Sequence, residues 1–346
     1  MTNRSAADVV IIGAGVIGLS IARQISRCSK LSIVVLDKSP AVGAGSTGAS
    51  SAVLRHRYSY PAMVQLARDG IHAYRHWQSF TELSAPRARF EADSVLWLAH
   101  PKSNWAAEEQ QRLQAAGIRA AVLDDASLQK RYPSLNPCCR GLDIRAGEEH
   151  ECQGGGEHLL ELDGGHIDPM DVLQDLLEAN RLKGVQVRFK TNVKTVRTQN
   201  GRAVGVSLDS GAHIDAGIVV IASGPWCNQI IQQLDFDWRW NLTPTRIQII
   251  YRDRPQVISG AIPVCADLAS GIYFRLQNRG QQLLLGSTLP EDEMEAVSNP
   301  DDFLRIADDN FMQAKLHALH HRLPALPYRG NLRSYCGLYT VNRDDM

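Results

Sequence analysis

The stretch Val9-Val10-Ile11-Ile12-Gly13-Ala14-Gly15-Val16-Ile17-Gly18 decides the fold. Its apolar run is typical of a buried parallel strand, and the G-x-G-x-x-G that follows is typical of the turn into a nucleotide-binding helix. The first glycine permits a tight turn, the second lets the backbone approach a pyrophosphate, and the third lets helix and strand pack closely. The start of the helix offers unpaired N–H groups and a positive dipole end to phosphates. The residues predicted to contact a nucleotide are Gly13, Gly15, Val16, Ile17 and Gly18.

A second apolar strand, Ser32-Ile33-Val34-Val35-Leu36, ends at Asp37, nineteen residues after Gly18. A carboxylate there can accept hydrogen bonds from a ribose diol and disfavours a 2′-phosphate. Strand, glycine turn, helix, strand and acid in this order predict one βαβ dinucleotide-binding unit, with Lys38 beside the acid as a further contact. The alternative is a glycine-rich turn without a ligand.

The bulk properties favour small-molecule chemistry. The chain has 346 residues, enough for about two domains, and its formal net charge is zero. No global field therefore draws it to nucleic acid or to an anionic membrane. The apolar stretch 9–21 is too short to span a bilayer, and no signal-peptide pattern precedes it. Seven scattered cysteines suit reduced thiols, so we expect a cytoplasmic location.

Hydrophobic periodicity predicts alternating helices and strands. The pattern becomes rich in strands after residue 242. This order indicates a dinucleotide-binding domain assembled from discontinuous segments, with a second, mixed-sheet domain inserted between them. Helices are predicted at 66–80, 104–116, 170–183 and 303–323, and strands at 95–99, 118–123, 185–189, 193–197, 203–208, 218–221, 246–251, 271–275 and 282–285.

Three later motifs, in their order and spacing, carry a resemblance to a known family. They are Gly45-Ser46-Thr47-Gly48-Ala49-Ser50-Ser51, Gly165-His166-Ile167-Asp168-Pro169 and Val219-Val220-Ile221-Ala222-Ser223-Gly224-Pro225-Trp226. Together with the βαβ unit, they make the chain resemble the FAD-dependent D-amino-acid-oxidase superfamily, and within it the sarcosine oxidase and glycine oxidase-like amine oxidoreductases. The likeness spans essentially the whole chain.

The resemblance implies an α/β fold with two domains. A Rossmann-like FAD-binding domain is expected from residues 1–85 and 160–235, with a final segment near 325–346. An inserted mixed-sheet α+β substrate domain is expected from 86–159 and 236–324. In this family the flavin lies where the two domains meet.

The resemblance also implies which residues bind FAD. The small-residue loop would approach the pyrophosphate and flavin through Ser46, Thr47, Ser50 and Ser51. The backbone of Val193 would face the adenine, and Ser223, Gly224 and Trp226 would approach the cofactor after a buried strand. The alternatives are ordinary turn residues in the loop and simple core packing for Val193.

Two residues are implied for the substrate. Arg55 matches the arginine that binds the substrate carboxylate in sarcosine oxidase-like members, and a guanidinium can hold a carboxylate bidentately. Tyr273 matches an active-site tyrosine, and Arg275 could face the same pocket. The alternatives are a solvated basic face for residues 55–57 and a core aromatic for Tyr273.

The chain departs from that family at three places. Leu284 stands where monomeric sarcosine oxidases carry a lysine that promotes reaction with oxygen, which makes a dehydrogenase competitive with an oxidase. Gly337 stands where those oxidases attach flavin to a cysteine, and Cys336 should point to the opposite face of its strand. We therefore expect noncovalent FAD. Relatives continue beyond the end of this chain, so a truncated product or a completing partner is a further expectation.

A metal site is the weaker interpretation of one cysteine- and histidine-rich stretch. Cys138, Cys139, His150, Cys152 and His158 lie within 21 residues, but their spacing fits no zinc pattern. A variable surface insertion is favoured, and no metal is predicted. The histidines at 317, 320 and 321 are expected to be exposed helix residues.

The sequence thus predicts an FAD-dependent oxidoreductase that oxidises the C–N bond of a small amino acid or N-methylated amino acid. One alternative is a dehydrogenase of D-amino acids or imino acids with an acceptor other than oxygen. Another is a catalytically silent FAD-binding subunit. The expected partners are an amino-acid-like substrate and an electron acceptor or partner subunit, with no nucleic acid and no membrane span.

Overall fold

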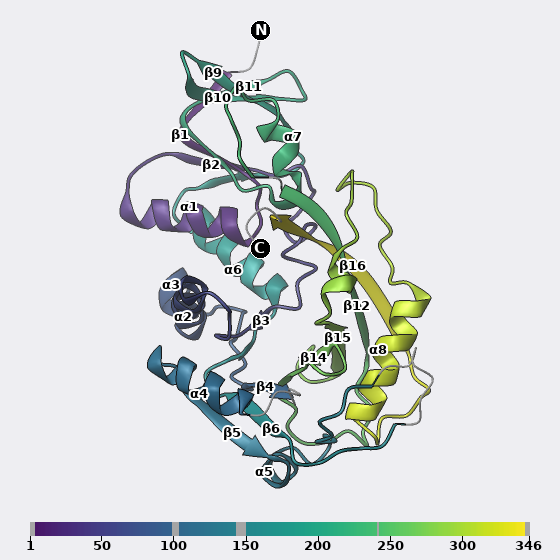
Figure 1. Cartoon of the computed structure of the whole chain (residues 1–346). Helices are drawn as coiled ribbons and strands as arrows, with labels where there is room; N and C mark the ends of the chain where they lie inside the picture. The colour runs from purple at the N-terminus through teal and green to yellow at the C-terminus, as the bar shows by residue number, and fades with distance from the viewer. Residues whose placement is uncertain (1–3, 99–103, 143–149, 241, 343–346) are drawn as a thin grey trace.

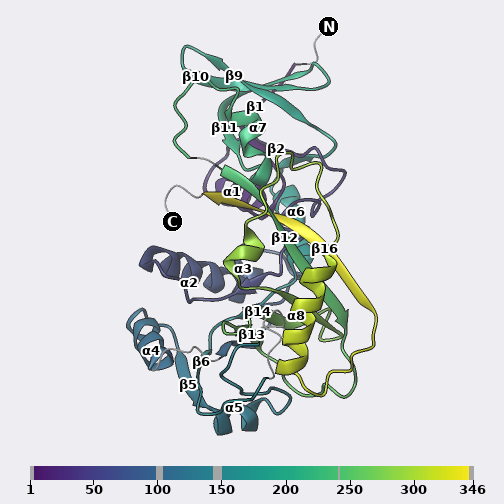
Figure 2. The same ribbon diagram turned by 45° about the vertical axis from the view of Figure 1, so that its right-hand side comes forward.

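The computed structural model describes residues 4–98, 104–142, 150–240 and 242–342. Within these residues the strands form sheets of six, eight and two strands. Figure 1 shows the six-stranded sheet in the upper part of the molecule and the eight-stranded sheet below it. The turned view of Figure 2 shows the long strands β12 and β16 running from the lower part toward the upper part.

The six-stranded sheet has the order β8-β2-β1-β11-β10-β9. Neighbouring strands among the first four run parallel, whereas β10 is antiparallel to both of its neighbours. Val9 and Ile11 face a core shared with α1 and α6, whereas Val10 and Ile12 face a core shared with β10 and α7. Burial on both faces explains why β1 is apolar throughout. The elements are β1 (Arg4–Ile12), α1 (Val16–Cys28), β2 (Ile33–Leu36), α6 (Pro169–Leu182), β8 (Gln186–Arg188), β9 (Val193–Gln199), β10 (Arg202–Leu208), β11 (His213–Ile221), η2 (Gly224–Trp226) and α7 (Cys227–Ile231).

The eight-stranded sheet has the order β16-β12-β15-β14-β13-β4-β6-β5. A short pair, β3 with β7, lies between the segments of the chain that build the two large sheets. The remaining elements are β3 (Val53–Leu54), α2 (Pro61–Arg75), α3 (Trp77–Thr81), β4 (Val95–Leu98), α4 (Trp105–Ala115), β5 (Ala120–Asp124), α5 (Asp125–Arg131), β6 (Glu157–Glu161), β7 (Gly165–His166), β12 (Leu242–Asp253), β13 (Val264–Asp267), β14 (Ile272–Gln277), β15 (Gln282–Ser287), η3 (Pro290–Glu293), α8 (Asp309–Arg322) and β16 (Leu332–Asn342).

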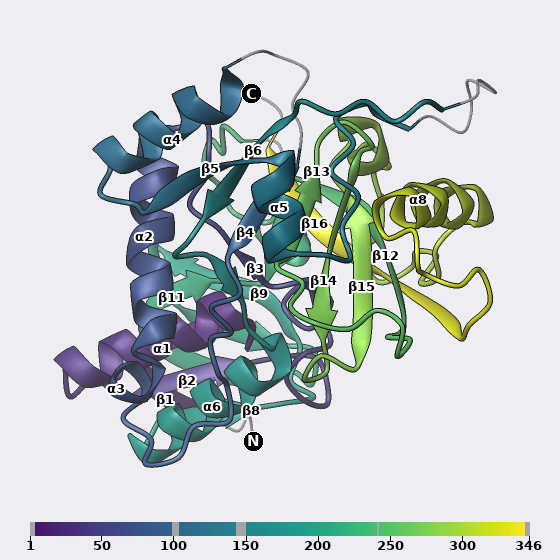
Figure 3. The same ribbon diagram turned by 90° about the horizontal axis from the view of Figure 1, so that it is seen from below.

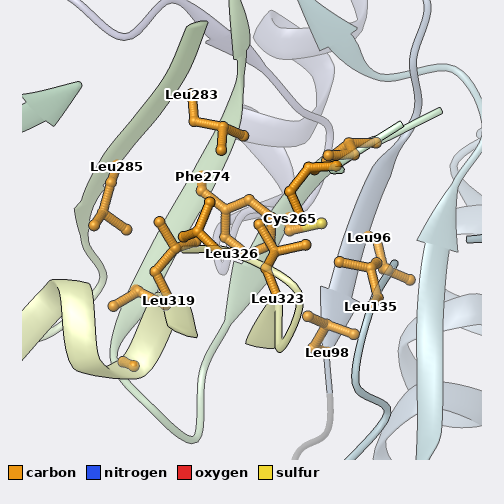
Figure 4. Close-up of a cluster of buried hydrophobic side chains, with 14 of the residues drawn as sticks. Leu96, Leu98, Leu135, Cys265, Phe274, Leu283, Leu285, Leu319, Leu323 and Leu326 are labelled. Atoms are coloured by element: carbon orange, nitrogen blue, oxygen red, sulfur yellow. The ribbon is translucent and has the colours of Figure 1, made fainter. Parts of the chain in front are cut away.

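The two faces of the eight-stranded sheet differ in character. One face packs against α8, where Phe274, Leu283 and Leu285 meet Leu319 and Leu323 in the largest buried cluster (Figure 4). Successive side chains of a strand point to opposite faces, so the intervening residues form a second set. This second set includes Tyr273, Arg275, Leu284, Gly286, Tyr335, Gly337 and Tyr339. The second face therefore carries Tyr273 and Arg275, which the sequence singled out, together with two further tyrosines that it did not.

The predicted α/β class is confirmed, and most predicted elements occur within a few residues of their expected positions. The helix expected at 303–323 begins only at Asp309. The buried guanidinium of Arg246 accounts for this difference, because it donates to the carbonyls of Leu304 and Ile306 and to the Asp308 carboxylate. These bonds hold the preceding segment as a loop.

The expected placement of the C-terminal segment is wrong for its strand. The sequence predicts a final segment of the FAD-binding domain near 325–346, but β16 pairs antiparallel with β12 from Leu332 to Asn342 in the eight-stranded sheet. The length of β12 offers a continuous ladder of backbone hydrogen bonds to this strand. Pattern analysis also missed α5, β6 and β13, which are short.

Candidate cofactor and substrate site

The glycine turn after β1 has no room for side chains. Gly13 has a φ of +109°, and a Cβ there would lie 2.4 Å from the Ala222 carbonyl oxygen at the end of β11. A Cβ at Gly18 would lie 2.0 Å from the Gly13 carbonyl oxygen. The glycines at the first and last positions of the motif are therefore required by sterics, as the sequence predicts.

The start of α1 faces the small-residue loop. The N-cap residue Gly15 brings no side-chain cap, and the first turn carries no acid. The Val16 N–H donates to Thr47 Oγ1 at 3.2 Å, so the loop lies over the positive end of the helix. Ile17 is 64% exposed on this first turn. A helix end of this kind suits a phosphate group.

Asp37 lies at the end of β2, beside the glycine turn. Its carboxylate accepts hydrogen bonds from the N–H groups of Ala14 and Ser39, both at 2.8 Å. These bonds hold the acid at the carboxyl edge of the parallel strands, where a ribose is bound in dinucleotide folds.

The small-residue loop is tightly folded and leaves one polar atom unpaired. A Cβ at Gly48 would lie 1.9 Å from the Gly43 carbonyl oxygen, so the loop closes on itself at this point. The Ser46 hydroxyl is buried without a hydrogen-bond partner among the described residues. Ser50 accepts a hydrogen bond from the Ala52 N–H at 3.0 Å. A buried hydroxyl without a partner is costly, which favours a ligand that would pair with it.

Lys38 and Trp226 meet each other at the edge of the same region. The Lys38 ammonium lies 4.5 Å from the centre of the Trp226 ring and 2.5 Å from Asp301 Oδ1. The Trp226 indole also donates to Asp301 Oδ1, at 2.9 Å. Asp301, which the sequence pattern did not single out, thus brings the predicted residues Lys38 and Trp226 together.

The remaining predicted cofactor residues lie at strand ends. Ser223 follows β11, and Gly224 has a φ of +52° with no atom within 4 Å of a Cβ built on it. The backbone is therefore open at this point. Val193 begins β9, and its side chain is buried in the core below the sheet. The core-packing alternative thus describes its side chain, while a backbone role stays a prediction.

The loop and the eight-stranded sheet meet at Ser51. Arg275 Nε donates to the Ser51 carbonyl oxygen at 2.6 Å. Burial raises the pKa of the Tyr273 hydroxyl, and the nearby Ser51 opposes that rise. The Tyr273 ring lies over Gly286, where a Cβ would come within 2.4 Å of it. A Cβ at Gly337 would lie 2.7 Å from Ala49 Cβ. The second face of the large sheet therefore faces the predicted cofactor loop.

The segment 55–57 is not a solvated basic face. A fully buried carboxylate, Glu161, accepts from the backbone N–H groups of His56 and Arg57 and from the Trp97 indole. Arg57 forms an ion pair with Glu109 at 2.8 Å. The segment is thus held by specific partners on its inner side.

Arg55 differs from its neighbours. Its guanidinium carbon lies 4.0 Å from the centre of the Tyr58 ring, and it donates to the Arg57 carbonyl oxygen. Among the described residues, neither Arg55 nor Arg275 has a carboxylate at ion-pair distance. Arg275 is 3% exposed, and burial lowers its pKa. This region therefore contains two guanidinium groups that form no ion pair with a carboxylate of the described residues.

Electrostatic interactions connect Arg55 to the second face of the sheet. Tyr339 of β16 interacts with Arg55, Tyr58, Tyr273 and Glu293, so these groups share one neighbourhood. Burial raises the pKa of the Glu293 carboxyl, and the nearby Arg55 opposes that rise. The structure therefore brings Arg55 and Tyr273 into one region.

Sequence reasoning missed three acids in or beside this region. Glu161 could have been found, because an acid inside the apolar run Leu159-Leu160-Glu161-Leu162 signals a buried carboxylate. Glu293 and Asp301 lie in polar segments that carry no such signal.

These features fit FAD by the nature of their donors. The open helix end and the hydroxyl groups of the loop suit a pyrophosphate, Asp37 suits a ribose, and the unpaired Ser46 hydroxyl lacks the partner that a ligand would supply. A model of the FAD dependent oxidoreductase family, DAO, matches residues 8–346. The chain belongs to this family. It is therefore an FAD-dependent oxidoreductase, as the sequence predicts.

Known proteins are similar to this family member over most of its length. FAD-dependent oxidoreductase domain-containing protein 1 of Mus musculus is 26% identical over 98% of this chain and 73% of its own length. The crystal structure of glycine oxidase from Bacillus cereus ATCC 14579 is 18% identical, with a TM-score of 0.78 over 97% of this chain and 83% of that chain. The crystal structure of L-proline dehydrogenase from P. horikoshii is 19% identical, with a TM-score of 0.80 over 99% of this chain and 83% of that chain. These two structures show the fold.

Two surface hollows lie elsewhere. One, of about 460 Å³, is lined by Tyr74–Gln78 and by residues between Pro86 and Phe90. The other, of about 800 Å³, is lined by the hairpin of β9 and β10 and by Gly217 of β11. Neither includes a predicted site residue. Among the described residues, we find no helix that is both long and apolar enough to cross a membrane.

Replacing Gly18 should abolish cofactor retention. In Gly18→Ala the new methyl group meets the Gly13 carbonyl oxygen, so the turn and helix must separate. We expect the variant to bind less than about one tenth of the flavin that the wild type binds. Separation of the turn from the helix should weaken the free energy of flavin binding by more than about 1.4 kcal/mol, which is tenfold in affinity. Gly70→Ala in α2 is the matched control, since its new Cβ meets nothing within 4 Å. Bound flavin is measured by absorbance against protein concentration. Equal flavin in both variants would contradict the assignment.

Proposed function

We propose that this enzyme oxidises the C–N bond of a small amino acid or N-methylated amino acid. The observation that carries the proposal is the Arg55 guanidinium, which lacks an ion-pair partner among the described residues and shares a neighbourhood with Tyr273. A guanidinium that forms no ion pair within the protein suits the carboxylate of a substrate. The similarity to a glycine oxidase and an L-proline dehydrogenase supports the same substrate class.

The residues of this chain would bind and orient the substrate. FAD, when bound, supplies the acceptor for the hydride that leaves the carbon next to nitrogen. Arg55 holds the carboxylate and so fixes the position of that carbon, which gains rate through orientation. Tyr273 lines the pocket, close to Ser51 of the cofactor loop. Arg275 fastens the same serine through its carbonyl oxygen.

Proton transfer needs no dedicated side chain in this proposal. The amine must be neutral when the hydride leaves, and water hydrolyses the imine product. Glu293 is an acid of this region that could pair with the ammonium group of a substrate, and burial raises the pKa of its carboxyl. We assign it no essential role as a base.

Substitution of Arg55 tests the substrate assignment. Arg55→Ala should weaken binding of a reactive amino acid by about 2–5 kcal/mol, because it removes one half of a buried charge pair. Arg55→Lys should recover part of the loss, since it keeps the charge without the planar fork. The measurement is anaerobic bleaching of bound flavin during titration with glycine, sarcosine, D-alanine and L-proline.

The control for this experiment is Arg119→Ala, whose side chain is 70% exposed in its pair with Asp163. Flavin content should be unchanged in all three variants. An unaltered dissociation constant in Arg55→Ala would remove this arginine from the site. A wild-type protein that binds FAD but shows no bleaching with any amine or amino acid would instead favour the silent subunit.

We also propose that FAD is held without a covalent bond. Gly337 faces Ala49 of the cofactor loop and offers no thiol. Cys336 is buried on the opposite, α8-facing side of β16, near Arg246, and burial raises the pKa of its thiol. Both observations disfavour attachment at this strand.

Denaturation tests noncovalent binding. Acid precipitation of the protein should release all flavin into the supernatant, because no bond remains once the fold is lost. Cys336→Ser should behave in the same way. Flavin that stays in the washed wild-type pellet and leaves the pellet in Cys336→Ser would show a covalent link through this residue.

A dehydrogenase is the second candidate, and one observation favours it. Leu284 is fully buried in an apolar cluster with Ile247 and Ile249, so this position supplies no cation to stabilise superoxide.

The seven cysteines are free, which suits the cytoplasmic location that remains a prediction.

The acceptor can be identified by reoxidation. After anaerobic reduction by a substrate, we expect oxygen to reoxidise the flavin more slowly than an artificial acceptor such as a dichlorophenol dye or a quinone. The difference should be about tenfold or more if the missing cation would have lowered the barrier to reaction with oxygen by about 1.4 kcal/mol. Stopped-flow absorbance measures both rates. Faster reoxidation by oxygen would favour an oxidase, with Arg275 as the nearest buried cation on the same sheet face.

A further inference from the structure

Four potential metal ligands converge outside the flavin region. Cys138, His150 and Cys152 come from the segment between α5 and β6, and His321 comes from the last turn of α8. One ligand atom from each residue lies within 4.8 Å of the others. Figure 3 shows α8 on the right, with the blue-green chain that follows α5 passing beside it. Residues 169 positions apart thus meet in one cluster.

Two sulfur–nitrogen distances in the cluster match those of a tetrahedral site. Cys138 Sγ lies 3.4 Å from His150 Nε2, and Cys152 Sγ lies 3.5 Å from His321 Nε2. With bonds of about 2.3 Å to sulfur and 2.0–2.1 Å to nitrogen, tetrahedral zinc separates a sulfur from a nitrogen ligand by about 3.6 Å. The two imidazole rings meet nearly edge to face, with centroids 4.4 Å apart and an angle of 74° between them. Their ring nitrogens can therefore converge on one ion.

Each sulfur also receives an N–H group, as a thiolate ligand requires. The Gln153 backbone N–H donates to Cys138 Sγ at 3.4 Å. The Asn136 side-chain amide donates to Cys152 Sγ at 3.5 Å. Such outer contacts orient metal ligands and stabilise their charge. Two thiolates would neutralise a divalent ion, which suits a site next to the cation of Arg322.

The surrounding contacts hold the four residues in place. Arg322 forms a fully buried ion pair with Asp267 at 2.7 Å and donates to the Cys138 carbonyl oxygen at 3.0 Å. Asn136 donates twice to the same helix end, from its backbone N–H to the Arg322 carbonyl oxygen and from its side-chain amide to the His321 carbonyl oxygen. The segment is therefore docked on α8 independently of any ion.

We propose that Cys138, His150, Cys152 and His321 form a structural zinc site that ties the segment between α5 and β6 to the end of α8. Four protein ligands leave no open position, so the site serves stability and not catalysis. Sequence spacing failed to indicate it because His321 lies on a distant helix. The two other residues of the suspected stretch belong elsewhere, since His158 pairs with Asp125 at 2.9 Å and Cys139 Sγ contacts the Gln153 carbonyl oxygen at 3.3 Å.

Metal analysis of the flavin-loaded full chain tests the site. The protein is purified with reductant, stripped with a chelator, reloaded with zinc chloride and desalted. Elemental analysis should then find about one zinc per chain. Cys152→Ser and His321→Asn should weaken zinc binding by more than about 100-fold, beyond the loss typical of an outer contact. Cys139→Ser is the matched control and should keep the full amount.

Two further measurements make the result decisive. Cobalt(II) in the stripped protein should give the visible bands of a tetrahedral sulfur-ligated ion, at wavelengths longer than the flavin absorption. Chelator should lower the melting temperature of wild type and of Cys139→Ser but not of Cys152→Ser. Cys152 is exposed, so its serine variant keeps the core intact even where a change at buried Cys138 prevents folding.

The proposal fails if zinc retention by wild type equals that of Cys152→Ser after reloading. It also fails if mass spectrometry of the reduced and desalted protein finds a disulfide between Cys138 and Cys152, which would leave no thiolates for an ion. Neither outcome bears on flavin content or substrate reduction, which are measured separately.

Discussion

The contact at Ser51 joins the two halves of the active region. A buried arginine on β14 donates to the carbonyl oxygen of this serine, and the tyrosine two residues before that arginine lies close to the same serine. The guanidinium has no acidic partner among the described residues, so the bond to the loop is one of the few interactions that compensate its burial. The position of the cofactor loop over the sheet depends on this arrangement.

The rest of the region follows from the alternation of side chains in the large sheet. One face is apolar and packs on α8, and the other presents tyrosines and an arginine toward the loop. Glycines occur where the loop or a ring touches the strand, at Gly286 and Gly337. A shift of register by one residue would bury the polar set under α8 and turn the leucines toward the loop. The pairing of β12, β14, β15 and β16 therefore determines which side chains face the loop.

Buried charges recur wherever irregular segments must be held. Glu161 fixes the backbone within the basic segment, Arg246 keeps residues 304–308 from extending α8, and Arg322 docks the long segment after α5. In each case one side chain with several donors or acceptors satisfies backbone groups that no strand or helix pairs. Loops that carry functional groups are thus positioned by charges placed in the core.

The sequence by itself determined the family, the βαβ unit and the glycine turn, because these depend on local sterics and on hydrophobic periodicity. It also indicated Arg55 and Tyr273, although only through resemblance. The tertiary structure alone decided which basic residues have acidic partners, where β16 pairs, and that His321 joins two cysteines from another segment. The physical reason is that charge pairing, strand pairing and metal ligation join residues far apart along the chain, and no local pattern in the sequence records such contacts.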